Sequence, residues 1–156
     1  MQLIINNVSK QYRGGVWGLR DFNLTIGPGV SAASPAVTAG RLVTVGGFES
    51  AFVPARDIHV WLPPGYSEAQ RYAVLYMHDG QNLWDAATTW NRQEWGVDEA
   101  VSKLLEDGAI RDVIVVGIPN AGSERAIEYL PQAPFEAMAE AEDRRELRVR
   151  IVGPDE

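Results

Sequence analysis

The chain of 156 residues contains no cysteine. This excludes disulfides, zinc sites built on cysteine and thiolate catalysis, although it leaves the compartment open. Only two histidines occur, His59 and His78, so few groups are available for acid–base chemistry near neutral pH. No apolar run approaches the roughly 20 residues of a membrane helix, and no basic start followed by an apolar segment marks a signal peptide. We therefore expect no membrane insertion, and the sequence as it stands indicates a soluble, cytoplasmic chain.

Positive charge is scarce as well. Lysine and arginine number 14 against 21 acidic residues, which gives a formal net charge of −7. Because binding to a phosphate backbone depends on basic surface, nucleic acid is excluded as an expected partner. The 46% of hydrophobic residues suffices for one compact core, so the composition is that of a globular protein.

The chain divides into two unlike pieces. Residues 1–30 are predicted to form a short β-ribbon, with a turn at Gly14 and Gly15. Residues 31–40, SAASPAVTAG, consist of small residues and are predicted to be a flexible linker; the tail of a signal peptide is the alternative. From residue 41 to 156 the pattern alternates between strands and a helix, which is typical of an α/β sheet.

Two runs in the ribbon, NVSKQY (7–12) and GLRDFNLTI (18–26), are similar to the start of the ATP-binding domain of ABC transporters. That resemblance implies that Tyr12 stacks on adenine. Nucleotide binding, however, needs a Gly-x-x-x-x-Gly-Lys-Ser/Thr loop, and the sequence has none. We therefore interpret Tyr12 as an aromatic residue of the ribbon, and a transporter ATPase fragment remains an alternative.

Apolar patterns predict four strands and one amphipathic helix in the larger piece. The strands are expected at 41–45, 58–62, 72–77 and 113–118, and the helix at 97–105, with a stop at Asp107-Gly108. A further, charged helix is expected at 135–150.

The runs at 72–77 and 113–118 are continuously apolar, which is typical of strands covered on both faces. A strand, a helix and a strand form a right-handed parallel unit, so these two strands are expected side by side in the sheet interior. Their loops, 78–95 and 119–131, would then meet at one edge, where open α/β sheets bind ligands.

Three motifs follow one another in this piece: IHVWLPPGY (58–66), HDGQNLWD (78–85) and VVGIPN (115–120), the last followed by Arg125 and Tyr129. In this combination and order, over residues 41 to 134, the chain resembles the putative esterase family of α/β-hydrolases, the enterochelin-esterase and esterase-D-like enzymes. The resemblance implies a partial α/β-hydrolase sheet, mixed with a mostly parallel core, behind the N-terminal ribbon.

The resemblance also implies a serine hydrolase that acts on a small-molecule ester without a cofactor. In such enzymes backbone N–H groups hold the oxyanion, and here this role falls on Gly80 and Gln81. The positions that match the substrate pocket are Asn82, Asn120, Arg125 and Tyr129. A salt-bridged arginine and a packed tyrosine are equally ordinary alternatives for the last two.

The histidines fit catalysis poorly. His78 lies before the oxyanion loop, whereas the family's histidine follows its serine, so we interpret His78 as a structural, hydrogen-bonded residue. His59 lies inside a strand and is expected on a sheet face. A metal site needs three or four convergent ligands, and the candidates His78, Asp79 and Asp85 are too few.

The nucleophile is missing. No Gly-x-Ser-x-Gly turn occurs in residues 1–156, and the nearest serine, Ser123, has a glycine on one side only. We expect an ester hydrolase half that stops before its nucleophile and is inactive alone. A non-catalytic module that binds a small ligand is the other alternative, and the open edge of an unfinished sheet predicts self-association.

Overall fold

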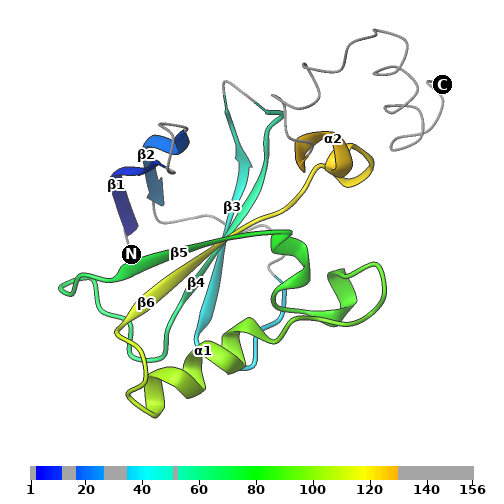
Figure 1. The fold of residues 1–156 in the computed structure, drawn as a ribbon. Helices are drawn as coiled ribbons and strands as arrows, with labels where there is room; N and C mark the ends of the chain where they lie inside the picture. Colours follow the sequence, from blue (N-terminus) through cyan, green and yellow to red (C-terminus); the bar gives the residue numbers. More distant parts are fainter. Residues whose placement is uncertain (1–2, 12–16, 27–34, 51–52, 130–156) are drawn as a thin grey trace, which may run out of the picture.

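The computed structural model describes residues 3–11, 17–26, 35–50 and 53–129. Two sheets are present in this part of the chain, one of two strands and one of four (Figure 1). The strands are β1 (Leu3–Gln11), β2 (Trp17–Ile26), β3 (Arg41–Phe48), β4 (Arg56–Leu62), β5 (Ala73–His78) and β6 (Val113–Ile118). The helices are α1 (Val97–Glu106) and α2 (Arg125–Tyr129), with 3₁₀ turns η1 (Gly80–Asn82), η2 (Ala86–Thr88) and η3 (Gly122–Glu124).

The predicted N-terminal ribbon is confirmed. β1 and β2 pair antiparallel, with Leu3 opposite Ile26. The glycine turn and Tyr12 lie outside the described residues, as does the helix expected at 135–150.

The larger sheet has the strand order β3-β4-β6-β5. It is mixed, as predicted, but among the described strands only β5 and β6 run parallel, while β3–β4 and β4–β6 are antiparallel. The parallel pair still brings the loops after β5 and β6 to one end of the sheet, which confirms the predicted meeting of these two loops.

The prediction that the strand at 72–77 lies in the interior is wrong for the sheet that the structure describes. β5 is its edge strand and Leu75 is 43% exposed, whereas the central β6 buries Val115 and Val116 completely. An apolar run predicts a buried strand but carries no information on which strands pair with it. The runs of β5 and β6 therefore gave the same prediction.

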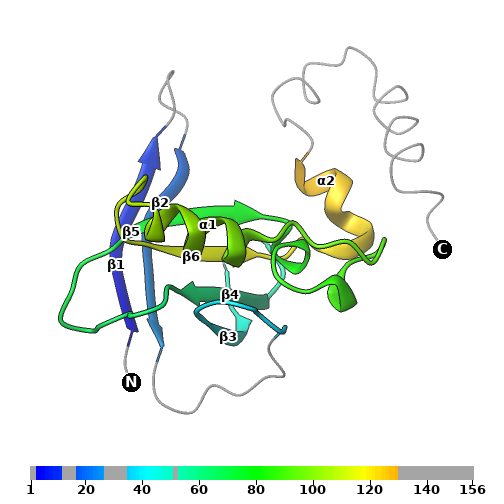
Figure 2. The ribbon, with the colours of Figure 1, turned by 90° about the horizontal axis from the view of Figure 1, so that it is seen from below.

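The sheet separates two clusters of buried side chains. Figure 2, seen from below, shows α1 in front of β5 and β6, and α1 contributes Val97 and Val101 to the cluster on its side. That cluster is completed by Trp61, Leu83, Trp84 and Val115. The cluster of the opposite face consists of Ile58, Val60, Leu62, Ile114 and Val116.

Helix α1 has the predicted bounds to within one residue, and Gly108 after it has the left-handed φ of 64° that favours glycine. Its buried Asp98 accepts hydrogen bonds from the backbone N–H groups of Thr38 (2.8 Å) and Ala39 (3.2 Å). Thr38 and Ala39, which belong to the segment predicted to be a flexible linker, are therefore fixed to α1. Among the described residues, no helix combines the length and apolarity needed to cross a bilayer.

Candidate functional site

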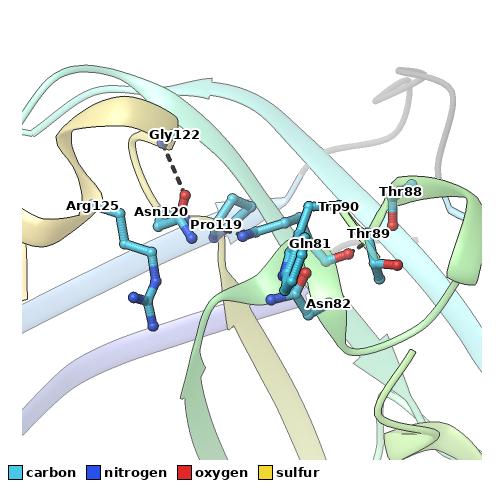
Figure 3. A pocket seen from close by; sticks show the side chains of 9 residues that line it. All are labelled: Gln81, Asn82, Thr88, Thr89, Trp90, Pro119, Asn120, Gly122 and Arg125. Carbon is cyan, nitrogen blue, oxygen red and sulfur yellow. Dashed lines mark hydrogen bonds between the residues drawn. The ribbon is translucent and has the colours of Figure 1, made fainter. Parts of the chain in front are cut away.

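The loops after β5 and β6 enclose a cleft of about 580 Å³ at the carboxyl end of the parallel pair. Figure 3 shows Gln81, Asn82 and Trp90 on the β5 side and Asn120 and Arg125 on the β6 side. Thr88, Thr89, Pro119 and Gly122 complete the lining. Amides, hydroxyls and one guanidinium therefore surround a partly apolar hollow.

The turn η1 lies directly on β6, and two glycines allow this. A Cβ atom on Gly80 would be 2.6 Å from the backbone C of Gly117 and 2.7 Å from the N of Ile118. The Cα of Gly80 in turn lies 3.4 Å from where a Cβ on Gly117 would stand. The close approach requires glycine at position 80 for space, since its φ is not in the left-handed region.

The backbone amides of this turn differ in their partners. Asn82 N donates to Asp79 O at 2.8 Å, and among the backbone hydrogen bonds of the described loops none is donated by Gly80 N or Gln81 N. Gly80 is buried, whereas Gln81 is half-buried and lines the cleft. The side chain of Gln81 also reaches across, where its Oε1 accepts from Asn120 N at 3.2 Å.

Asp79 connects the two sides of the cleft. Its Oδ1 accepts hydrogen bonds from Asn120 Nδ2 (2.6 Å), Arg125 Nε (2.8 Å) and Tyr129 OH (3.2 Å). Its Oδ2 accepts from Arg125 Nη2 at 2.7 Å, so the arginine binds the carboxylate with two parallel hydrogen bonds. One carboxylate thus connects the end of β5 to the loop after β6 and to α2.

Asp79 is only 6% exposed and has φ 55° and ψ 42°, a left-handed backbone that is uncommon for residues other than glycine. The hydrogen bonds from Arg125 lower the pKa of its carboxyl group to about 2, those from Asn120 and Tyr129 act in the same direction, and burial opposes them. Asp79 is therefore ionised at every ordinary pH.

A second ion pair fixes α2 to β4. Arg56 donates from Nη2 to Glu128 Oε1 (2.5 Å) and from Nη1 to Glu128 Oε2 (3.0 Å), and Glu128 Oε2 also accepts from Ala121 N (3.2 Å). The bond from Arg56 lowers the pKa of Glu128. This pair holds the loop after β6 from the side away from Gly80.

The opposite wall of the cleft is less constrained. Trp90 is 88% exposed, and its indole is available as a flat apolar surface. Beside it, Asn82 Oδ1 is buried without a hydrogen-bond partner among the described residues.

The histidines lie away from this cleft. His59 Nδ1 is 3.0 Å from Thr44 Oγ1 between β3 and β4, and burial lowers the pKa of His59. The ring of His78 packs edge-on against Tyr129, and both line a neighbouring cavity of about 540 Å³. In the part of the chain that the structure describes, no group of three or more metal-ligating side chains occurs.

Four of the six predicted site residues line one cleft: Gln81, Asn82, Asn120 and Arg125. Gly80 directly precedes Gln81 in η1 and is buried against β6. Tyr129 is connected to them through Asp79 and lines the neighbouring cavity instead. The connecting role of Asp79 was not predicted from the sequence. The sequence signal for this role was an acidic residue directly after an apolar strand, with an arginine in the loop after the next strand.

Comparison with known proteins gives a family for this architecture. The model of the putative esterase family matches residues 51–149. The ribbon at the N-terminus lies outside the match, so its similarity to transporter ATPases stays a prediction.

One similar solved structure is a mutant of the feruloyl esterase module from Clostridium thermocellum complexed with sinapinate. Its sequence identity is 24% and its TM-score is 0.39, and the match covers 54% of this chain and 28% of that one. A second is a CE1 ferulic acid esterase from Anaeromyces mucronatus in complex with ferulic acid, at 16% identity, a TM-score of 0.41 and coverage of 76% and 46%. The chain thus spans less than half the length of these esterases.

Proposed function

The chain belongs to the putative esterase family, and from this premise we propose that it serves carboxylic ester hydrolysis of the serine type. In this function Gln81 N–H donates to the oxyanion that forms when an ester carbonyl is attacked, and Gly80 is the spacer that brings this amide to the cleft.

The observation that carries the proposal is the placement of η1. A glycine packed on the β6 backbone is followed by a half-buried residue that lines the cleft and whose N–H has no partner in the described loops. An oxyanion site needs such preorganised donors at the position where negative charge develops. The loss of one donor of this kind typically lowers turnover by about 10²–10³.

Substrate contacts are proposed for Asn82 and Asn120, whose amides face the cleft from its two sides (Figure 3). Arg125 uses two of its five N–H groups on Asp79, and the remaining ones are available to a polar group of the ester. Tyr129 contributes indirectly, because its hydroxyl donates to Asp79 and its ring lies 4.7 Å below the guanidinium of Arg125.

The attacking hydroxyl is not supplied by the known motif, because no serine of this sequence stands in a Gly-x-Ser-x-Gly turn. We therefore propose that the chain of 156 residues binds esters but hydrolyses them no faster than background. Residual catalysis by an oxyanion site without its nucleophile and base is small.

The test combines hydrolysis with binding. Purified chain is assayed on p-nitrophenyl acetate, and ¹⁵N-labelled chain is titrated with phenyl acetate while backbone amide shifts are recorded. We expect background hydrolysis and selective shifts at Gln81 and Asn82. Turnover that a serine reagent abolishes would overturn the proposed inactivity, and unchanged Gln81 and Asn82 signals would overturn the ester site itself.

A non-catalytic binding module is a second candidate. It is favoured by the exposed Trp90, which lines the cleft and provides an apolar surface that needs no nucleophile to hold a ligand. A phosphonate analogue of the tetrahedral intermediate that binds no more tightly than the matching ester would favour this candidate, since an oxyanion site binds the charge of the transition state more strongly than the ester.

A further inference from the structure

We propose that Asp79 is the positioning residue of η1, the turn whose Gln81 N–H is proposed to bind the oxyanion. Its carboxylate fixes the place of Gln81 N–H by joining the turn to the loop after β6. The importance of that amide rests on the proposed function, in which it donates to the oxyanion. Asp79 is not part of the cleft lining, so it acts through its neighbours and not by touching a substrate.

The contacts of Asp79 come from three separate places in the chain. Asn120 lies in the loop after β6, while Arg125 and Tyr129 stand at the two ends of α2, and together they place four hydrogen bonds on the carboxylate. Asp79 directly precedes Gly80, so a carboxylate that is held in place also restrains the backbone at the start of η1.

The backbone of Asp79 explains why side-chain anchoring is needed. Its φ of 55° places a non-glycine residue in the left-handed region, which costs about 1 kcal/mol or more unless its surroundings compensate. In that conformation Asp79 O accepts from Asn82 N and closes the turn. The four side-chain bonds hold the conformation that aims the next two amides.

The change Asp79→Asn tests this directly. Asparagine tolerates the left-handed backbone and has the same shape as aspartate, but it carries no negative charge, and its NH₂ group cannot accept the hydrogen bond from Arg125 Nη2. The substitution therefore breaks the paired hydrogen bonds from Arg125 and leaves a neutral acceptor oxygen alone to hold the turn, while backbone preference and volume stay almost unchanged.

A matched control exists in Glu128. Its half-buried carboxylate accepts from Arg56 and from Ala121 N, so it also fixes the loop after β6, yet none of these hydrogen bonds reaches η1. If Asp79 were only one of several structural ion pairs, Glu128→Gln would loosen the turn as much as Asp79→Asn does.

The experiment compares ¹⁵N relaxation of the full chain in the wild type, Asp79→Asn and Glu128→Gln. We expect backbone order parameters at Gly80 and Gln81 of about 0.85 in the wild type and in Glu128→Gln, and below about 0.6 in Asp79→Asn. Amide exchange at Asn82, whose N–H closes the turn, should be at least about tenfold faster in Asp79→Asn only. Unchanged order at Gly80 and Gln81 in Asp79→Asn, or equal loosening in Glu128→Gln, would overturn the proposal.

Should Asp79→Asn fail to fold, Arg125→Lys provides the second variant, because lysine keeps the charge but cannot form the two parallel bonds. It should loosen Gly80 and Gln81 relative to the wild type, and an unchanged turn would count against Asp79. The outcome is separable from the proposed function: loosening of the turn supports the positioning role even if phenyl acetate leaves Gln81 unshifted, and that second result overturns only ester binding.

Discussion

The change Gly80→Ala tests the closest contact on which the site depends. The added Cβ would stand 2.6, 2.7 and 2.8 Å from three backbone atoms of Gly117 and Ile118, closer than Cβ atoms normally come to non-bonded heavy atoms. These neighbours belong to the central strand β6 and cannot rotate away as a side chain would. We expect a loss of about 3 kcal/mol in the free energy of unfolding, the upper part of the usual range for overpacking.

Differential scanning calorimetry measures this loss as a fall in Tm of about 6–12 °C, since about 1 kcal/mol shifts a chain of this size by about 2–4 °C. The matched control is Gly46→Ala in β3, where the new Cβ would meet only Asp57 Oδ1 at an ordinary 3.6 Å. Neither glycine has a positive φ, so backbone preference is the same for both. Equal melting temperatures of the two variants would refute the close packing of η1 on β6.

Three further outcomes are expected. The pKa of Asp79 is lowered from 3.8 to about 2, so its ionisation stabilises the folded state above about pH 4. As the pH falls from 4 to 2, the free energy of unfolding should decrease by roughly 2 kcal/mol. Urea unfolding at several pH values should show this loss in the wild type and not in Asp79→Asn. Glu128→Gln, which weakens the half-buried pair with Arg56, should lower the free energy of unfolding by about 1–3 kcal/mol. Asp107→Asn, in the exposed pair with Lys103, should change it by less than about 1 kcal/mol. Equal urea midpoints of the two variants would contradict this difference. Leu75→Lys on the edge strand β5 should weaken self-association about tenfold by light scattering, and a wild type that is already monomeric would contradict the predicted association.

The element pattern could be predicted because it is local. The helix at 97–106 was visible from the spacing of Val97, Val101 and Leu105, and its end from Asp107-Gly108. The strands were visible as apolar runs, and their parallel pairing followed from the helix between them. Family motifs then pointed to Gly80 and Gln81 before any geometry was known.

The neighbours of each element could not be predicted in the same way. Whether β5 is central or at the edge depends on which other strands pair with it, and its apolar run contains no information on that choice. The docking of Thr38 and Ala39 on Asp98 depends on contacts about 60 residues apart in the sequence. Such contacts follow from the fold and leave no periodic signal in the chain.

The role of Asp79 changes what the cleft can recognise. Taken from the sequence alone, Arg125 was a candidate cation for binding a substrate. In the structure, Asp79 neutralises much of that charge through two parallel bonds, and among the described residues no acidic side chain lines the cleft itself. In the proposed site, recognition would therefore depend on amide and hydroxyl hydrogen bonds and on the face of Trp90 more than on net charge. An ester held in this way would be selected by its shape and its hydrogen-bonding groups, and its binding would respond only weakly to salt.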